Sequence, residues 1–129
     1  MKYGYTIVYV PVVAESLAFF EKAFGFKRRM LTDEGDYGEL ETGTTTLAFA
    51  AHQLAESNTK SGFVFCSQSD KPVGIELAFV TDNVNNAHAT ALKAGASELA
   101  SPKEKPWGQT VSYLRCPDGT LVELCTPVG

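Results

Sequence analysis

Two glutamates stand alone in apolar stretches that are typical of strands. Glu76 lies in residues 75–80 and Glu123 in residues 120–125. Because side chains alternate along a strand, Glu76 points away from Leu77, and Glu123 points away from Val122. If the apolar side chains face the core, both carboxylates lie on the opposite side. Two neighbouring carboxylates cannot both stay ionised cheaply, so we expect this pair to hold a proton or a cation. If the protein is an enzyme, Glu76 and Glu123 are its candidate catalytic residues.

Strand alternation also directs Gln109 and Tyr113 to the side of the carboxylates. Glu39 joins them if Leu40 faces the helices, although an exposed glutamate near a turn is the commoner case. Trp107 is predicted to form the wall of a pocket for a planar ligand, with a hydrophobic plug as the alternative. These residues predict an acidic, aromatic site for a small molecule.

The histidines and cysteines give weaker chemical signals. His52 and His88 have no partner at a metal-ligand spacing, and His88 is expected at the surface of a helix or half buried. The cysteines are odd in number and lack C-x-x-C spacing, which indicates reduced thiols: Cys66, Cys116 and Cys125. A divalent metal held by Glu76 and Glu123 would be Mg, Mn or Ca, the ions that prefer oxygen ligands.

The elements that position these residues follow one order twice, β-α-β-β-β. In the first half, strands are predicted at residues 3–10, 26–31, 37–42 and 44–51, with a helix at about 16–24. The second half has strands at 75–80, 97–100, 110–114 and 120–125, with a helix at 84–94. Both helices end at a glycine, Gly25 and Gly95, which is typical of a helix C-terminus. The repeated order predicts a duplication.

Length and charge limit the possible functions. The 129 residues, 44% of them hydrophobic, predict one domain: module one at about 1–60, a connecting loop at about 52–72 and module two at about 73–129. The net charge of -4 argues against nucleic acid or an anionic membrane as a partner. No apolar run is long enough to span a membrane, and we expect a cytoplasmic protein.

Three stretches carry a family resemblance: YVPVVAESLAFFEKAFGFKRR, ELAFVTDNVNNAHATALKAGA and CPDGTLVEL. They resemble the vicinal-oxygen-chelate superfamily, which includes glyoxalase I, the bleomycin-resistance proteins and the extradiol dioxygenases. The resemblance implies an α+β fold of two paired modules that form an open, cup-shaped sheet with helices on the outer face. It also implies a homodimer.

The same resemblance identifies the positions where metal-using members place their ligands. Here these positions are Tyr5, Ala48, Glu76 and Glu123. Ala48 has no donor atom, and Tyr5 is better suited to donate a hydrogen bond than to bind a metal as a phenolate. The first hypothesis is therefore a small-molecule binder with a cationic or aromatic ligand in an acidic cup. The alternative is a metal-dependent lyase, isomerase or dioxygenase that uses Glu76 and Glu123.

Overall fold

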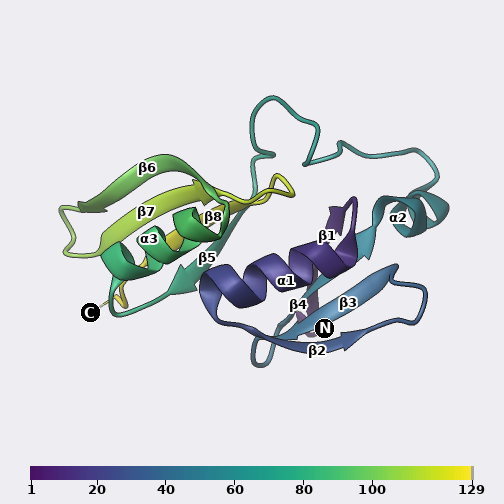
Figure 1. Cartoon of the computed structure of the whole chain (residues 1–129), viewed down its shortest axis with the longest axis horizontal. Helices are drawn as coiled ribbons and strands as arrows, with labels where there is room; N and C mark the ends of the chain where they lie inside the picture. Colours follow the sequence, from purple (N-terminus) through teal and green to yellow (C-terminus); the bar gives the residue numbers. More distant parts are fainter. Residues whose placement is uncertain (129) are drawn as a thin grey trace.

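Two β-α-β-β-β units follow one another in the computed structural model, which describes residues 1–128. The first unit contains β1 (Tyr5–Val10), α1 (Val13–Phe24), β2 (Lys27–Leu31), β3 (Tyr37–Glu41) and β4 (Thr46–Ala51). The helix α2 (His52–Thr59) follows it. The second unit contains β5 (Glu76–Val80), α3 (Val84–Ala94), β6 (Ser97–Glu104), β7 (Thr110–Arg115) and β8 (Leu121–Cys125). The two units lie side by side, and α1 and α3 meet between them (Figure 1).

Each unit folds into one four-stranded mixed sheet, and the two sheets have the same strand order. The orders are β1-β4-β3-β2 and β5-β8-β7-β6. In each sheet the first and last strands of the unit pair in parallel, and the other pairs are antiparallel. Both sheets are open, and β1 and β5 are free edges. The predicted α+β fold of two matched modules is confirmed.

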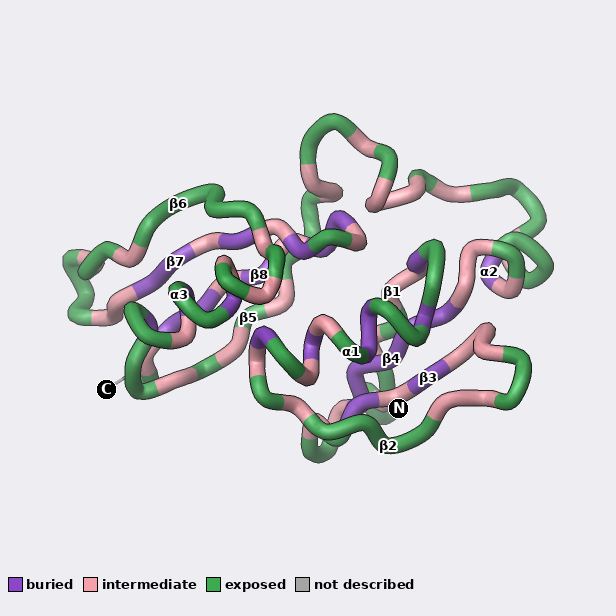
Figure 2. Tube along the Cα trace, in the orientation of Figure 1, coloured by how far each residue is buried: buried purple, intermediate pink, exposed green. Residues whose placement is uncertain are grey.

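One face of each sheet is buried under its helix. Along α1, Val13, Leu17 and Phe20 recur at a helical spacing and are at most 1% exposed, which places one apolar stripe of the helix against the sheet. Phe79 of β5 packs against Phe24, with ring centroids 5.0 Å apart, so the core continues from one module into the other. Figure 2 shows the buried residues along the helices and the central strands. The opposite face of each sheet is not covered by that helix.

Two elements differ from the sequence prediction. Helix α2 occupies the first part of the predicted loop at 52–72; only Ala55 of this helix is buried, so the sequence carries no apolar stripe to reveal it. Strand β6 was predicted at residues 97–100 but continues to Glu104. It can include Pro102, because an edge strand tolerates a residue that cannot donate to the ladder. None of the helices in the described chain is long and apolar enough to cross a membrane.

Candidate functional site

The face of the second sheet that points away from α3 carries both predicted glutamates. On β8, Val122 and Leu124 are buried in the core, which turns Glu123 to the opposite side. On β5, Leu77 packs against the core in the same way, and Glu76 is exposed on the other side. Tyr113 follows the same alternation on β7, because its neighbours Ser112 and Leu114 are fully buried. The second sheet therefore places Glu76, Glu123 and Tyr113 on one face.

Contacts on this face join four side chains: Glu76, Tyr113, Glu123 and Cys125. We call these residues the carboxylate cluster. The Tyr113 hydroxyl donates a hydrogen bond of 3.0 Å to Glu123 Oε1. Although Glu76 is exposed, partial loss of hydration raises the pKa of its carboxyl, and the nearby charge of Glu123 raises this pKa further. Burial and the charge of Glu123 also raise the pKa of the Cys125 thiol, which keeps this thiol protonated.

The carboxylate cluster contains no cation. Among residues 1–128, Glu76 and Glu123 form no ion pair, and the ion pairs of the chain lie elsewhere. The hydrogen bond from Tyr113 raises the pKa of that phenol, so its hydroxyl stays neutral and acts as a donor. The cluster thus gathers two acidic groups without a positive charge to balance them.

The open face of the first sheet also carries acidic groups, but an arginine neutralises them. Gly38 faces α1, since a Cβ there would lie 2.7 Å from a methyl group of Leu17, and Glu39 therefore points to the open face. Arg29 donates two hydrogen bonds to Glu41, of 2.7 and 3.1 Å, and its Nη1 lies 3.5 Å from Glu39. Glu39 also accepts a hydrogen bond of 2.8 Å from the Tyr37 hydroxyl. Its charge is satisfied within the chain.

Matched strands relate the residues of one module to those of the other. Ile7 and Ala78 are equivalent, because each is the third residue of its strand, β1 or β5. In the parallel pair β1 and β4, Ile7 is opposite Ala48. In the parallel pair β5 and β8, Ala78 is opposite Glu123. Ala48 is therefore the equivalent of Glu123. The first sheet has an alanine where the second has a carboxylate.

Comparison with known proteins agrees with this duplicated architecture. Residues 3–129 match the family model described as a glyoxalase-like domain. The chain belongs to this family. The chain is therefore a glyoxalase-like domain of the vicinal-oxygen-chelate superfamily. A search of curated proteins finds no significant match to its sequence.

Solved structures show the same fold at low sequence identity. A glyoxalase/bleomycin resistance protein/dioxygenase family enzyme from Burkholderia phytofirmans PsJN is 19% identical, with a TM-score of 0.82 and 98% of each chain covered. A glyoxalase-related enzyme from Fulvimarina pelagi is 18% identical, with a TM-score of 0.82, covering 100% of this chain and 93% of that one. TioX from Micromonospora sp. ML1 is 16% identical, with a TM-score of 0.72 and 98% of each chain covered. These similarities establish the fold and leave the ligand open.

The residues at the expected metal positions do not fit a metal centre within one chain. Tyr5 and Glu76 stand two residues before Ile7 and Ala78, so they are equivalent, but they lie on different sheets. Tyr5 lies near Tyr37, whose pKa is raised chiefly by burial and in a smaller part by Tyr5. In the part of the chain that the structure describes, no group of three or more His, Cys, Asp or Glu side chains could hold a metal ion. The donor set of this glyoxalase-like domain is two carboxylates.

Trp107 and Gln109 form a separate group at the start of β7. Trp107 is 67% exposed, and its Nε1 donates a hydrogen bond of 2.8 Å to Gln109 Oε1. Gln109 Nε2 in turn donates to the carbonyl oxygen of Thr126 at 2.7 Å. The bonds hold the indole at the end of the sheet. The structure does not bring it into contact with the carboxylate cluster.

Two residues important to the structure escaped the sequence analysis. His88 was expected at the surface or half buried; that prediction is wrong, since it is 4% exposed and lies between Ser112 and Glu98. His88 follows Val84 by about one helical turn, so it lies on the buried face of α3; this spacing could have predicted its burial. Arg29 neutralises Glu39 and Glu41 across the β2–β3 pair, a role that the sequence analysis did not assign to it.

Proposed function

We propose that this glyoxalase-like domain binds a small cationic or aromatic molecule, with Glu76 and Glu123 as its charged contacts. The supporting observation is the difference between the two sheets. Glu39 and Glu41 have Arg29 as an internal cation, whereas the carboxylate cluster has none. A ligand that carries an ammonium or guanidinium group would supply the missing charge.

The protonation of Glu76, as well as the charge of the carboxylate cluster, supports a cationic ligand. A cation between the carboxylates would favour the ionised form of Glu76, which is otherwise disfavoured by burial and by Glu123. Tyr113 would hold Glu123 in position through its hydrogen bond and would offer a ring face to the cation or to an aromatic group. Binding of a cation is therefore expected to lower the raised pKa of Glu76.

The free sheet edges support the proposal that the protein is a homodimer. Strands β1 and β5 each have one side without a strand partner in their sheet. They carry exposed apolar side chains, with Tyr5 57% and Val80 66% exposed. Unpaired edges of this kind favour association with a second chain. Sedimentation at micromolar concentration that shows only monomer would contradict the dimer.

A metal-dependent lyase, isomerase or dioxygenase reaction is the weaker candidate for the same two glutamates. The repulsion between Glu76 and Glu123 favours a divalent cation as well as an organic one. However, Ala48 offers no donor atom, and Tyr5 lies on the other sheet. The remaining ligands would have to come from outside the chain. We therefore favour ligand binding over metal-dependent catalysis.

Titration with benzylammonium, a small aromatic cation, tests the proposal. In a calorimetric titration, Glu76→Gln and Glu123→Gln should each weaken binding about tenfold, since a hydrogen bond to a charged group contributes about 1.5 kcal/mol or more. Glu39→Gln is the matched control, because the charge of Glu39 is already met by Arg29. Equal affinity of all three variants and the parent protein would overturn the proposal.

Parallel titrations with Mg²⁺, Mn²⁺, Ca²⁺, Zn²⁺ and Ni²⁺ distinguish the two candidates. If the protein binds an organic cation, these ions should neither bind tightly nor displace benzylammonium. A divalent ion that displaces benzylammonium from the parent protein, but does not bind to Glu123→Gln, would favour the metal-dependent alternative.

A further inference from the structure

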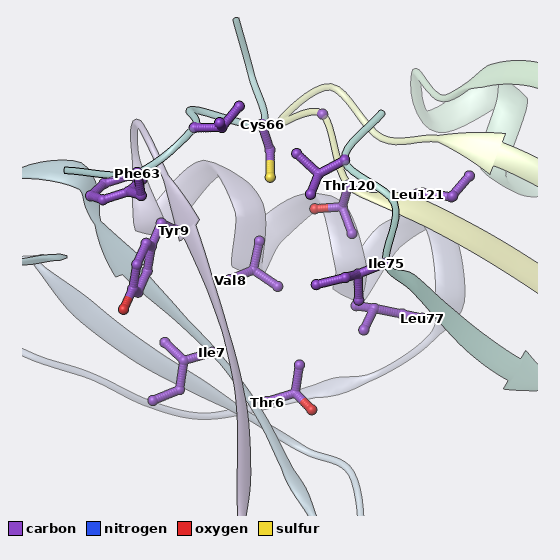
Figure 3. Close-up of a pocket in the computed structure, with 13 residues that line it drawn as sticks. Thr6, Ile7, Val8, Tyr9, Phe63, Cys66, Ile75, Leu77, Thr120 and Leu121 are labelled. Atoms are coloured by element: carbon purple, nitrogen blue, oxygen red, sulfur yellow. The ribbon is translucent and has the colours of Figure 1, made fainter. Parts of the chain in front are cut away.

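A cavity of about 200 Å³ lies between the two modules, beside the free edge of β1 (Figure 3). Its walls come from β1, from the start of β5 and from the beginning of β8, and residues 63–66 cover it. The main apolar side chains that line it are Ile7, Val8, Tyr9, Phe63, Ile75 and Leu77. Ile75, which directly precedes β5, and Leu77 alternate with Glu76, so Glu76 points away from these two side chains and does not line the cavity. The cavity is therefore distinct from the carboxylate cluster.

The lining of this cavity has no charged side chain and few free polar groups. The Thr120 hydroxyl donates a hydrogen bond of 2.7 Å to Asp118, and the Thr6 hydroxyl is bonded to that of Tyr3 at 2.6 Å. The other polar side-chain atoms of the lining residues are the Tyr9 hydroxyl and the sulfur of Cys66, which points into the cavity in Figure 3. Burial raises the pKa of this thiol, so it is neutral at pH 7. An ion inside would lose its hydration without a partner.

The cover of the cavity is fixed in place by side-chain contacts. The guanidinium group of Arg115 donates hydrogen bonds of 2.9, 2.8 and 3.0 Å to the carbonyl oxygens of Cys66, Ser69 and Asp70. The ring of Phe63 packs edge-on against Tyr9, with centroids 4.7 Å apart. These contacts hold residues 63–70 over the gap between the modules, so the cavity is a preformed site.

We infer that this cavity is a second binding site, for a neutral apolar molecule about the size of one substituted aromatic ring. An apolar protein cavity of about 150 Å³ is large enough to bind benzene, so the volume found here admits a slightly larger ring. The edges of Tyr9 and Phe63 offer aromatic contacts to such a ring. The site is independent of the cationic ligand proposed above, because different side chains would bind the two molecules.

Toluene is a suitable probe of this second site. Its binding should shift the methyl resonances of Ile7 and Leu77 and protect Cys66 from iodoacetamide. At a toluene concentration about twice its Kd, alkylation of Cys66 should be about threefold slower, because only the empty fraction of the protein exposes the thiol. Peptide mass spectrometry separates Cys66 from Cys116 and Cys125, which are buried.

Matched variants establish where toluene binds. Ile75→Trp places a larger side chain at the cavity wall and should abolish both the methyl shifts and the protection of Cys66. Leu99→Trp makes a similar change at a 47% exposed residue of β6 outside the cavity and should leave both effects unchanged. Glu123→Gln should also bind toluene normally, so failure of the cationic site and failure of this site can be told apart.

Three results would overturn the inference. One is the absence of any toluene effect on Ile7 and Leu77. Another is protection of Cys66 by benzylammonium as strong as that by toluene, which would show that the site does not select neutral molecules. The third is protection of Cys66 that rises with protein concentration and not with toluene, which would show that a second copy of the chain covers the cavity.

Discussion

Ala48 and Glu123 occupy equivalent positions in the two modules, opposite Ile7 and Ala78 across the parallel strand pairs. The duplicated fold therefore presents two different faces. Beside Ala48, the acidic group Glu39 is bound by Arg29 and by a tyrosine hydroxyl. Glu123 has a tyrosine donor as well, but no cation. Among residues 1–128, the open face of the second module therefore carries two acidic groups without a neutralising cation, whereas that of the first module does not.

Glu76→Gln should stabilise the protein at pH 7 more than at pH 4. Burial and the charge of Glu123 raise the pKa of Glu76 above its ordinary value of 4.5 in the folded state. The folded protein thus holds this proton to a higher pH than the unfolded chain does. Stability is fully present below the ordinary pKa and decreases as the pH rises through the raised one. Glutamine has no proton to lose, so the variant avoids that decrease.

Urea unfolding at the two pH values measures this effect. Glu56→Gln on α2 is the control, since Glu56 is exposed and lies outside the carboxylate cluster. The control should change the free energy of unfolding little at either pH. A gain for Glu76→Gln that is the same at pH 4 and pH 7 would refute the linkage.

Tyr113→Phe should weaken the binding of benzylammonium about threefold to tenfold, because one hydrogen bond typically contributes about 0.5–1.5 kcal/mol. The lost hydroxyl donates to Glu123 and holds its carboxylate in place. Tyr37→Phe is the matched control, since the hydroxyl of Tyr37 serves Glu39 on the other sheet. Calorimetry on both variants checks the prediction. A larger loss for Tyr37→Phe would move the ligand to the first sheet.

The sequence predicts the faces of the strands well because apolar packing leaves little choice. Leu77 and Val122 must be buried, and a period of two then places Glu76 and Glu123 together on the other face. The repeat of strand, helix and glycine likewise predicts two matched modules. These inferences depend on local periodicity alone, which a single sequence displays.

Features that depend on partners distant in the chain cannot be predicted from local periodicity. Arg29 meets Glu39 and Glu41 only when β2 pairs with β3, and there it neutralises both carboxylates. Nothing in the local sequence marks this pairing. The cover over the apolar cavity is held by Arg115, whose partners lie more than 40 residues away in the chain. Their proximity follows only from the complete fold.

His88→Ala should destabilise the fold by about 2 kcal/mol, because it leaves a cavity and removes a partner from the buried Ser112 hydroxyl. The imidazole also lies 2.6 Å from the carboxylate of Glu98, so it joins α3 to two strands of its sheet. Thr90→Ala, an exposed change on the same helix, should have an effect below about 0.5 kcal/mol. Equal losses in urea unfolding would show that the histidine contacts are not stabilising.

Gly119→Ala should destabilise the protein more than Gly43→Ala, and the comparison isolates one contact. Both glycines have a left-handed backbone, with φ of 93° and 92°, so alanine is strained at either position by about 1 kcal/mol. A Cβ at Gly43 would meet nothing within 4 Å, but at Gly119 it would collide with the carbonyl oxygen of Cys66. Gly119→Ala must therefore displace the segment that Arg115 holds over the cavity.

In urea unfolding, Gly119→Ala should lower the free energy of unfolding by about 1–2 kcal/mol more than Gly43→Ala does. Faster tryptic cleavage after Lys60 should accompany that loss, because the displaced segment opens locally. If the two variants lose equal stability and are cleaved at equal rates, the approach of Gly119 to Cys66 does not hold the cover in place.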